Sequence, residues 1–150
     1  MKSDENMIKR AGIEDAVVLA YLASQLWTDH VPGDLIEEFR RLAMNDDAVC
    51  FITYVDDKPI AFAQCQLRHD YVEGTESSPV GYLEGIFVSE EYRKQGFAAE
   101  LLSECENWAR EKGCTEFASD CEFGNADSAK FHLSLGFEEV NRIICFRKDL

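Results

Sequence analysis

Residues 80–98, VGYLEGIFVSEEYRKQGFA, form the stretch of sequence that is most informative about the fold. Residues 80–88 are mostly apolar and predict a buried strand, within which Gly85 suggests a β-bulge or a close approach of the backbone. After a turn, an apolar face recurs at helical spacing and predicts a helix over residues 97–112, on the residues Phe97, Leu101, Cys105 and Trp108. The stretch therefore predicts a strand, a turn and an amphipathic helix in succession.

The turn between strand and helix, RKQGFA at residues 93–98, is a candidate anion site. The first backbone N–H groups of a helix have no intrahelical partner and carry partial positive charge, which together favour phosphate. Gly96 would let an anion approach the backbone, and the small Ala98 leaves the first turn open. Arg93 and Lys94 add positive charge. The stretch is neither a Walker loop nor a Rossmann fingerprint, and an ordinary strand-to-helix turn is the alternative.

The remaining chain predicts strands and helices without a repeat, a linker or a low-complexity tract, so we expect one domain over residues 1–150. Strands are expected over residues 7–10, 48–55, 60–67, 114–120 and 140–147, and further helices over residues 13–27, 34–44 and 125–135. In the first of these helices, helical spacing relates Ile13, Val17, Ala20, Tyr21 and Ser24. Asp34 is expected to cap the second helix. Residues 70–79 predict an acidic loop.

The charge of the chain limits its partners. Fifteen Lys and Arg against 29 Asp and Glu in 150 residues give a formal net charge of −14. This charge argues against nucleic acid and against anionic membranes, because binding them requires Lys and Arg. It suits a cationic ligand, which a negative field attracts, and it equally suits an acidic surface that only maintains solubility.

Cysteine usage and hydropathy bear on the compartment. The six cysteines include no Cys-x-x-Cys pair and no zinc-finger spacing, so no structural metal is expected. No apolar stretch approaches the roughly 20 residues that span a bilayer, and the acidic N-terminus lacks the apolar segment of a signal peptide. We therefore expect a cytoplasmic protein with free thiols, and a disulfide framework is the alternative.

Residues 88–98, the helix behind them and residues 125–137 (NADSAKFHLSLGF) resemble the GCN5-related N-acetyltransferases. In that family the pattern Arg/Gln-x-x-Gly-x-Gly/Ala binds the pyrophosphate of acetyl-CoA, and this chain has Arg93-x-x-Gly96-x-Ala98. Three more stretches are similar to the type I aminoglycoside 6'-N-acetyltransferases: YVEGT (71–75), SPVGYLEGI (78–86) and TEFASD (115–120). The resemblance implies a mixed α/β (α+β) class with the acetyltransferase fold, in which about four helices flank a central, mixed and mostly antiparallel sheet.

The resemblance implies acetyl-CoA as cosubstrate and no metal. Backbone groups of Ile86, Phe87 and Val88 would bond the pantetheine arm, which would lie along the strand as an added strand does. The pyrophosphate would be held by the backbone and side chains of Arg93, Lys94, Gln95, Gly96, Phe97, Ala98 and Ala99. Asn125 would reach the cofactor from the start of its helix.

The resemblance also places a site for a cationic aminoglycoside. The matching positions are Trp27, His30, Tyr71, Glu84, Asp120 and Asn141, of which the last is often an acid in relatives. These residue types suit the ligand, because carboxylates bind ammonium groups and aromatic rings offer a flat surface to sugars. Glu84 is also an acid within an apolar strand, and because burying a charge is costly, its presence there points to a function. Taken singly, Asp120 fits a turn residue and Trp27 a core residue.

The expected reaction is direct attack of the neutral 6'-amine on the thioester. Glu84 is expected to accept the proton, directly or through water, and Asp120 to orient the amine. A backbone N–H near Ile86 or Phe87 would polarise the thioester oxygen. His132 stands where many acetyltransferases have a Tyr that protonates the leaving thiolate, so it would either donate that proton or pack under the cofactor. Release of the thiolate without a dedicated acid is the other option.

Two other functions stay open at this point. The chain could acetylate another polyamine or a protein N-terminus, since acidic pockets suit these as well. It could also be a catalytically silent module that binds acetyl-CoA. Relatives of this kind are commonly dimers, and residues 140–147 could pair as a strand across a two-fold axis, so a homodimer is expected.

Overall fold

A five-stranded sheet in the order β1-β2-β3-β4-β5 organises the computed structural model, which describes residues 6–150. Its strands are β1 (Asn6–Arg10), β2 (Ala48–Val55), β3 (Lys58–Arg68), β4 (Val80–Val88) and β5 (Phe117–Ala118). The first four pair antiparallel in succession, and β5 lies parallel to β4. The mostly antiparallel, mixed sheet that the resemblance implied is confirmed.

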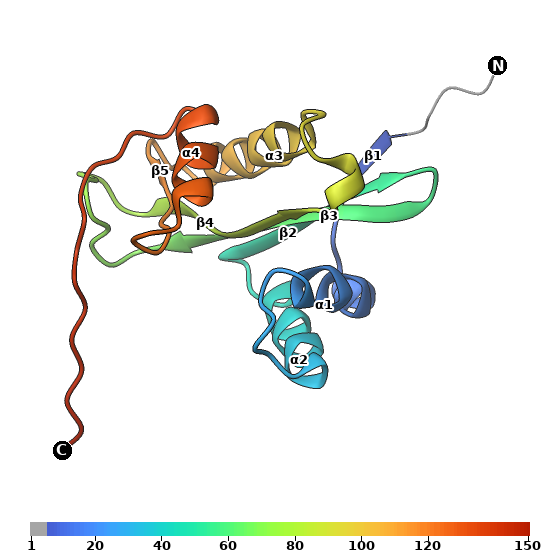
Figure 1. The fold of residues 1–150 in the computed structure, drawn as a ribbon, viewed down its shortest axis with the longest axis horizontal. Helices are drawn as coiled ribbons and strands as arrows, with labels where there is room; N and C mark the ends of the chain where they lie inside the picture. Colours follow the sequence, from blue (N-terminus) through green and yellow to red (C-terminus); the bar gives the residue numbers. More distant parts are fainter. Residues whose placement is uncertain (1–5) are drawn as a thin grey trace.

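Helices cover both faces of the sheet (Figure 1). One face carries α1 (Ala16–Ser24) and α2 (Pro32–Ala43), and the other carries α3 (Phe97–Glu111) and α4 (Ala126–Ser134). The predicted apolar face of α3 is confirmed, because Phe97, Leu101, Cys105 and Trp108 are all buried against the sheet. A second core lies on the opposite face, where Phe62 of β3 packs edge-on against Phe39 of α2.

The first helix differs from the prediction for residues 13–27. Ile13–Asp15 form the short 3-10 helix η1, and α1 follows it. The apolar spacing predicted the buried face only in part: Ala20 is buried, but Ile13, Val17 and Tyr21 are exposed. The other buried residues of this helix are Ala16, Leu19, Leu22 and Ala23. Because this helix is apolar almost all the way round, its spacing alone does not determine which side meets the sheet.

Helix α2 begins earlier than predicted. Pro32 occupies the first turn and Val31 is the N-terminal cap residue, so the prediction that Asp34 caps this helix is wrong. Proline suits this place because the first helical N–H groups have no intrahelical partner. Asp34 lies inside the first turn, where its negative charge still suits the helix dipole.

The last third of the chain holds less strand than predicted. Of residues 114–120, only Phe117 and Ala118 form a strand, and residues 140–147 form none, although a strand was expected there. The C-terminal segment instead leaves the body of the protein as an extended tail (Figure 1), with Ile144 80% and Phe146 91% exposed. A strand needs a hydrogen-bonded neighbour, and along residues 6–150 this segment has none.

Candidate active site

A β-bulge places Glu84. In the pairing of β3 with β4, Cys65 faces Leu83 and the next residue, Gln64, faces Gly85, so Glu84 has no partner in the register. A bulge re-aims a side chain and lets consecutive residues share one face of a strand. The bulge expected near Gly85 is therefore present, and its extra residue is the acid.

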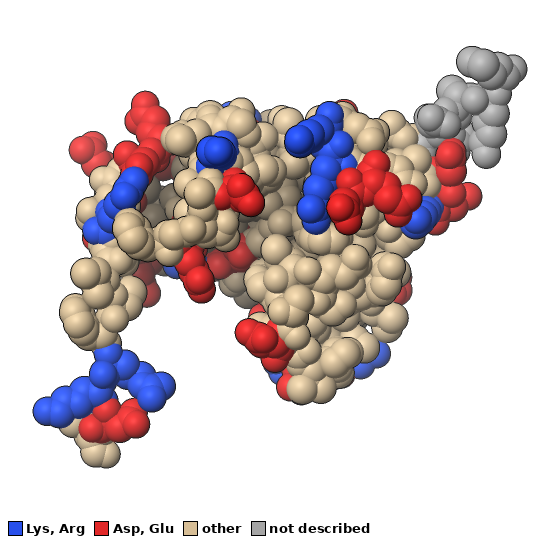
Figure 2. All heavy atoms as spheres, in the orientation of Figure 1, with Lys and Arg blue, Asp and Glu red and all other residues tan. Residues whose placement is uncertain are grey.

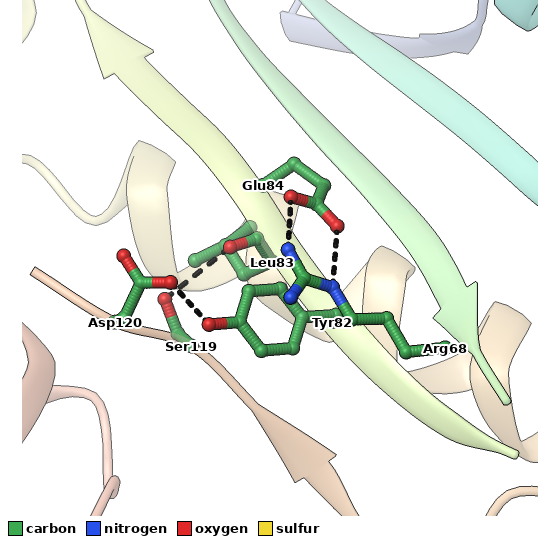
Figure 3. Close-up of polar contacts among 6 residues, drawn as sticks. All are labelled: Arg68, Tyr82, Leu83, Glu84, Ser119 and Asp120. Carbon is green, nitrogen blue, oxygen red and sulfur yellow. Dashed lines mark hydrogen bonds and ion pairs between the residues drawn. The ribbon is translucent and has the colours of Figure 1, made fainter. Parts of the chain in front are cut away.

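Glu84 is held by an arginine from the neighbouring strand (Figure 3). Arg68, the last residue of β3, donates from Nε to Glu84 Oε2 at 3.1 Å and from Nη2 to Oε1 at 2.8 Å. Its guanidinium carbon also lies 3.5 Å from the centre of the Tyr82 ring. The hydrogen bond to Glu84 is the main reason that the pKa of Arg68 is raised. The carboxylate is therefore fixed by two hydrogen bonds.

Asp120 joins the same cluster through Tyr82. The Tyr82 hydroxyl donates a hydrogen bond to Asp120 Oδ2, which connects β4 to the segment that follows β5. Burial and this hydrogen bond raise the pKa of Tyr82. The phenol therefore remains a hydrogen-bond donor at neutral pH, and Glu84 and Asp120 lie at the two ends of one Arg68–Tyr82 stack.

Trp27 lies beside the bulge. A β-carbon built on Gly85 would come 2.5 Å from Trp27 Cζ2, so the absent side chain of Gly85 makes room for the indole. The close backbone approach expected at Gly85 is thus present. The indole also packs edge-on against Phe62 at 6.0 Å between ring centres, and His30 lies 6.3 Å from it. Trp27 consequently packs against the core residue Phe62 on one side and against the backbone next to Glu84 on the other.

The other two predicted substrate positions lie at the loop that follows β3. Tyr71 is 75% exposed in the loop after β3. Asn141 donates from Nδ2 to Glu73 Oε2 at 2.9 Å, which ties the start of the C-terminal tail to the same loop. Gly74 allows the tail to approach this loop closely, since a β-carbon on Gly74 would lie 2.4 Å from the Val140 side chain. Within residues 6–150, no hydrogen bond or ion pair joins Tyr71 or Asn141 to Glu84 or Asp120.

His132 has both ring nitrogens engaged. Nδ1 donates to the carbonyl oxygen of Ser128 at 2.7 Å, because a carbonyl can only accept. Nε2 lies 2.8 Å from Ser119 Oγ, and that hydroxyl is 3.3 Å from the carbonyl oxygen of Leu83 on β4. The ring also packs against that of Phe137, at 5.3 Å between ring centres. A polar path thus runs from α4 through Ser119 to the edge of β4.

This edge of β4 is open where the cofactor was expected. In the part of the chain that the structure describes, β5 pairs with β4 only at Gly81 and Tyr82, so residues 83–88 have a strand neighbour on the β3 side alone. Within this open stretch, Phe87 is buried and Ile86 and Val88 pack partly against the core, so their backbone is fixed. An added extended chain can bond such an edge, which fits a pantetheine arm.

The turn before α3 also fits a pyrophosphate. Gly96 has φ +90°, a β-carbon there would meet no atom within 4 Å, and no side chain caps the helix. The first amides of α3, at Phe97, Ala98 and Ala99, thus face no capping group. Figure 2 shows Lys and Arg atoms gathered over this turn. The residues present therefore suit an anion.

Two side chains of the predicted cofactor site have additional contacts. Arg93 donates from Nε to the Val88 carbonyl oxygen at 2.8 Å, and its guanidinium lies 5.9 Å from the centre of the Phe87 ring. This contact fixes the turn to the end of β4. Asn125 caps α4, since its side-chain oxygen accepts from the Ser128 backbone N–H at 3.1 Å. Its amide nitrogen is the group that remains for a ligand.

Acidic atoms lie on both sides of the open gap that separates the C-terminal tail from helices α1 and α2 (Figure 2). In residues 6–150, no three His, Cys, Asp or Glu side chains are grouped to hold a metal ion. No helix in that part of the chain is long and apolar enough to cross a membrane.

All six cysteines are free thiols, so the structure contradicts the alternative of a disulfide framework. Cys50, Cys65, Cys105 and Cys114 are buried, whereas Cys121 and Cys145 are exposed. Burial raises the pKa of Cys50 to about 12, which keeps its thiol protonated and inert.

Three contributors to the site were missed from the sequence: Arg68, Tyr82 and Ser119. Tyr82 lies two residues before Glu84, and this period-2 spacing along a strand was an available signal. Arg68 has no such signal, because its contact with Glu84 depends on the strand pairing and on the bulge. Ser119 directly precedes Asp120, but its contact with His132 depends on where α4 packs.

Known proteins resemble this chain over most of its length. The profile of the Acetyltransferase (GNAT) family matches residues 19–137. An aminoglycoside N(6')-acetyltransferase type 1 from Serratia marcescens is 42% identical over 130 residues, which cover 86% of this chain and 89% of that protein. A protein of the same name from Stenotrophomonas maltophilia is 40% identical over 144 residues, covering 95% and 93% of the two chains.

Solved structures agree with the sequence matches. Aminoglycoside N-acetyltransferase AAC(6')-Iy in complex with CoA has a TM-score of 0.95 and 36% identity, covering 99% of this chain and 98% of that one. AAC(6')-Iy in complex with the bisubstrate analogue CoA-S-monomethyl-acetylneamine has a TM-score of 0.93 and 37% identity, with coverage of 97% and 99%. Both the sequence and the fold thus match known acetyltransferases. The chain belongs to the GNAT acetyltransferase family, within its group of type 1 aminoglycoside N(6')-acetyltransferases.

Proposed function

We propose that this protein transfers an acetyl group from acetyl-CoA to the 6'-amine of aminoglycosides and thereby confers resistance to them. The observation that carries the proposal is the pairing of two carboxylates, Glu84 and Asp120, around Tyr82 beside the open edge of β4. Relatives named for this activity support it, as does the relative solved with a CoA–aminoglycoside analogue.

Each acid has a proposed role in the transfer. Glu84 accepts the proton of the attacking amine, directly or through one water, because an ammonium group cannot attack a thioester. Asp120 orients the amine and offsets the positive charge of its neighbours. Trp27, His30, Tyr71 and Asn141 contact the rest of the aminoglycoside.

The cofactor is bound by this chain at two places. Acetyl-CoA supplies the acetyl group as a thioester. The backbone of Ile86, Phe87 and Val88 bonds its pantetheine arm, and an N–H near Ile86 or Phe87 polarises the thioester oxygen. The amides and side chains of residues 93–99 hold the pyrophosphate at the start of α3, and Asn125 contributes from the start of α4. For the departing thiolate, His132 in its doubly protonated form gives its Nε2 proton to Ser119 Oγ, while the hydroxyl proton of Ser119 passes to the thiolate sulfur. No metal is required.

The test is acetyl transfer to a panel of amines. With acetyl-CoA, the protein should acetylate kanamycin and tobramycin, while an aminoglycoside with a 6'-hydroxyl group should be inert. Spermidine and a peptide with a free N-terminus are the controls for other acceptors. Preference for either control over both drugs would reject the aminoglycoside assignment, and binding of acetyl-CoA without any transfer would leave only a binding module.

Residues 1–150 act as one acetyltransferase domain in a homodimer. The exposed apolar residues of the tail support a dimer, because Ile143, Ile144 and Phe146 face solvent in a single chain. Light scattering should then give twice the chain mass of 17.1 kDa, and removal of residues 142–150 should return the mass of one chain. A monomeric full-length protein would contradict this assembly.

The proposed compartment is the cytoplasm, and the proposed partners include neither nucleic acid nor membrane. Six free thiols fit a reducing compartment, where disulfides rarely form. The net charge of −14 disfavours phosphate-rich partners and suits a polycationic drug.

A further inference from the structure

The ion pair between Arg68 and Glu84 differs from local ion pairs on the protein surface. Arg40 and Glu37, for example, are three residues apart on α2, and both side chains are about half exposed. Arg68 and Glu84 are 16 residues apart on neighbouring strands, and the Glu84 side chain retains only 19% exposure. Strand pairing and the bulge bring them together, so the contact belongs to the tertiary structure.

Arg68 makes two kinds of contact at once. Its Nε and Nη2 form a two-pronged hydrogen bond with the Glu84 carboxylate, at 3.1 and 2.8 Å. Its flat face covers the Tyr82 ring at 3.5 Å (Figure 3). Only a planar guanidinium can do both, since the lysine ammonium is a point charge without a face.

Tyr82 extends the effect of Arg68 to the second acid. Its ring is covered by Arg68, while its hydroxyl donates to Asp120. A ring held from one side and hydrogen-bonded at its tip has little freedom to turn. Asp120 is thereby located relative to Glu84, although the two carboxylates come from different segments of the chain.

We propose that Arg68 is a positioning residue for acetyl transfer, which fixes Glu84 directly and Asp120 through Tyr82. The inference rests on the proposed function. It adds a residue that would not touch the reacting atoms itself but would determine the spacing of the two carboxylates between which the amine is placed. Reaction rates are sensitive to such spacing, because a displacement of about 1 Å can cost about 100-fold in rate.

The first test compares substitutions of Arg68 with a matched arginine outside the site. Arg68→Ala should lower kcat by about 10- to 100-fold, with the KM for acetyl-CoA unchanged. Arg68→Lys should recover only part of kcat, since it restores the charge but neither the two-pronged bond nor the stack. Arg40→Ala removes an exposed ion pair on α2 and should stay within about twofold of wild type.

A second test separates positioning from stability. Millimolar guanidinium ion should raise the kcat of Arg68→Ala but leave that of Arg40→Ala unchanged, because only the former loses a guanidinium at the site. In the double variant that combines Arg68→Ala with Tyr82→Phe, kcat should fall by less than the product of the two single-variant losses, since both substitutions disturb one chain of contacts. Retention of wild-type kcat by Arg68→Ala, absence of rescue, or fully multiplicative losses would overturn the inference.

The same measurements distinguish this inference from the proposed function. The acceptor is whichever amine of the panel the wild-type protein acetylates. Aminoglycoside turnover by wild type, together with an Arg68→Ala variant of equal kcat, overturns the inference alone. Turnover of spermidine in place of the drugs overturns the aminoglycoside assignment, while the kcat ratio still tests Arg68. A wild type that acetylates no amine overturns both.

Discussion

The Trp27 indole fills the space that a side chain on Gly85 would need: a β-carbon on Gly85 would lie 2.5 Å from Trp27 Cζ2 and 2.8 Å from Cη2. Gly85→Ala must therefore displace the indole. We expect a loss of about 1–3 kcal/mol in the free energy of unfolding, as for other overpacked sites, and a raised KM for the aminoglycoside. Urea unfolding and steady-state kinetics measure the two effects.

Gly33→Ala is the matched control for that substitution. Gly33 lies inside α2, and a β-carbon there would meet nothing within 4 Å. Alanine should stabilise this helix by about 0.5–1 kcal/mol and leave the KM for the drug unchanged. Equal KM values for the Gly85 variant and wild type would show that Trp27 does not contact the substrate.

The two ends of α3 offer a second matched pair. Gly96 and Gly113 have φ values of +90° and +93°, and a β-carbon at either would meet no atom within 4 Å. Alanine at either position should cost about 1–2 kcal/mol in backbone strain. Only Gly96→Ala should raise the KM for acetyl-CoA, because only its β-carbon would stand where the pyrophosphate is expected. Equal changes in KM for both variants would remove the anion site from this turn.

Glu84→Gln tests the proton acceptor. The amide keeps the size of the side chain but cannot accept a proton, so kcat should fall by about 10²- to 10⁴-fold and its rise with pH should disappear. The control is Glu37→Gln, which alters an exposed carboxylate on α2 that is paired with Arg40. An unchanged kcat and pH profile in the Glu84 variant would end its assignment as the base.

Ser119 and His132 should act as one unit. Because Nε2 of His132 lies 2.8 Å from Ser119 Oγ, removing either group breaks the same path to β4. Ser119→Ala and His132→Ala should lower kcat to similar extents, about tenfold or more, and the double variant should be no slower than the slower single variant. A near-normal kcat for His132→Ala would leave the ring with its packing role alone.

Glu116 gives a pH dependence of stability. The Ser77 hydroxyl and the backbone N–H groups of Glu76 and Ser77 donate to its carboxylate, which lowers its pKa below the ordinary 4.5. This stabilisation is present above about pH 4.5 and is lost as the pH falls through the lowered pKa. Glu116→Gln should therefore lower Tm at pH 7, and the difference from wild type should shrink below pH 4.5. Parallel curves of Tm against pH would contradict this.

Sequence patterns predict the fold well where polar residues separate the apolar ones. In α3 the apolar positions, such as Leu101 and Trp108, stand out against charged neighbours, so the buried face was predicted correctly. In α1 nearly every residue is apolar, and the sheet alone determines that Leu19 is buried while Tyr21 is exposed. The tail was predicted as a strand because composition cannot say whether a hydrogen-bonding neighbour exists.

Sequence reasoning finds those site residues whose chemical type is unexpected in their own segment. Glu84 stands out as an acid in an apolar strand, and the family resemblance adds Asp120. Tyr82 could have been found from its spacing of two residues before Glu84, whereas Arg68 is an ordinary residue in its own segment and becomes part of the site only through strand register and one extra residue in β4. Such contacts join segments that are distant in sequence, so local spacing does not reveal them.

The bulge in β4 has a consequence for how the fold and the chemistry depend on each other. Cys65 and Gln64 are adjacent on β3 and face Leu83 and Gly85, so a chain lacking Glu84 would continue the ladder without interruption. The sheet does not need this residue for its hydrogen bonds. An acid in such a position can be gained or lost with little demand on the architecture, and this makes the strand a scaffold on which the catalytic group can change while the fold persists.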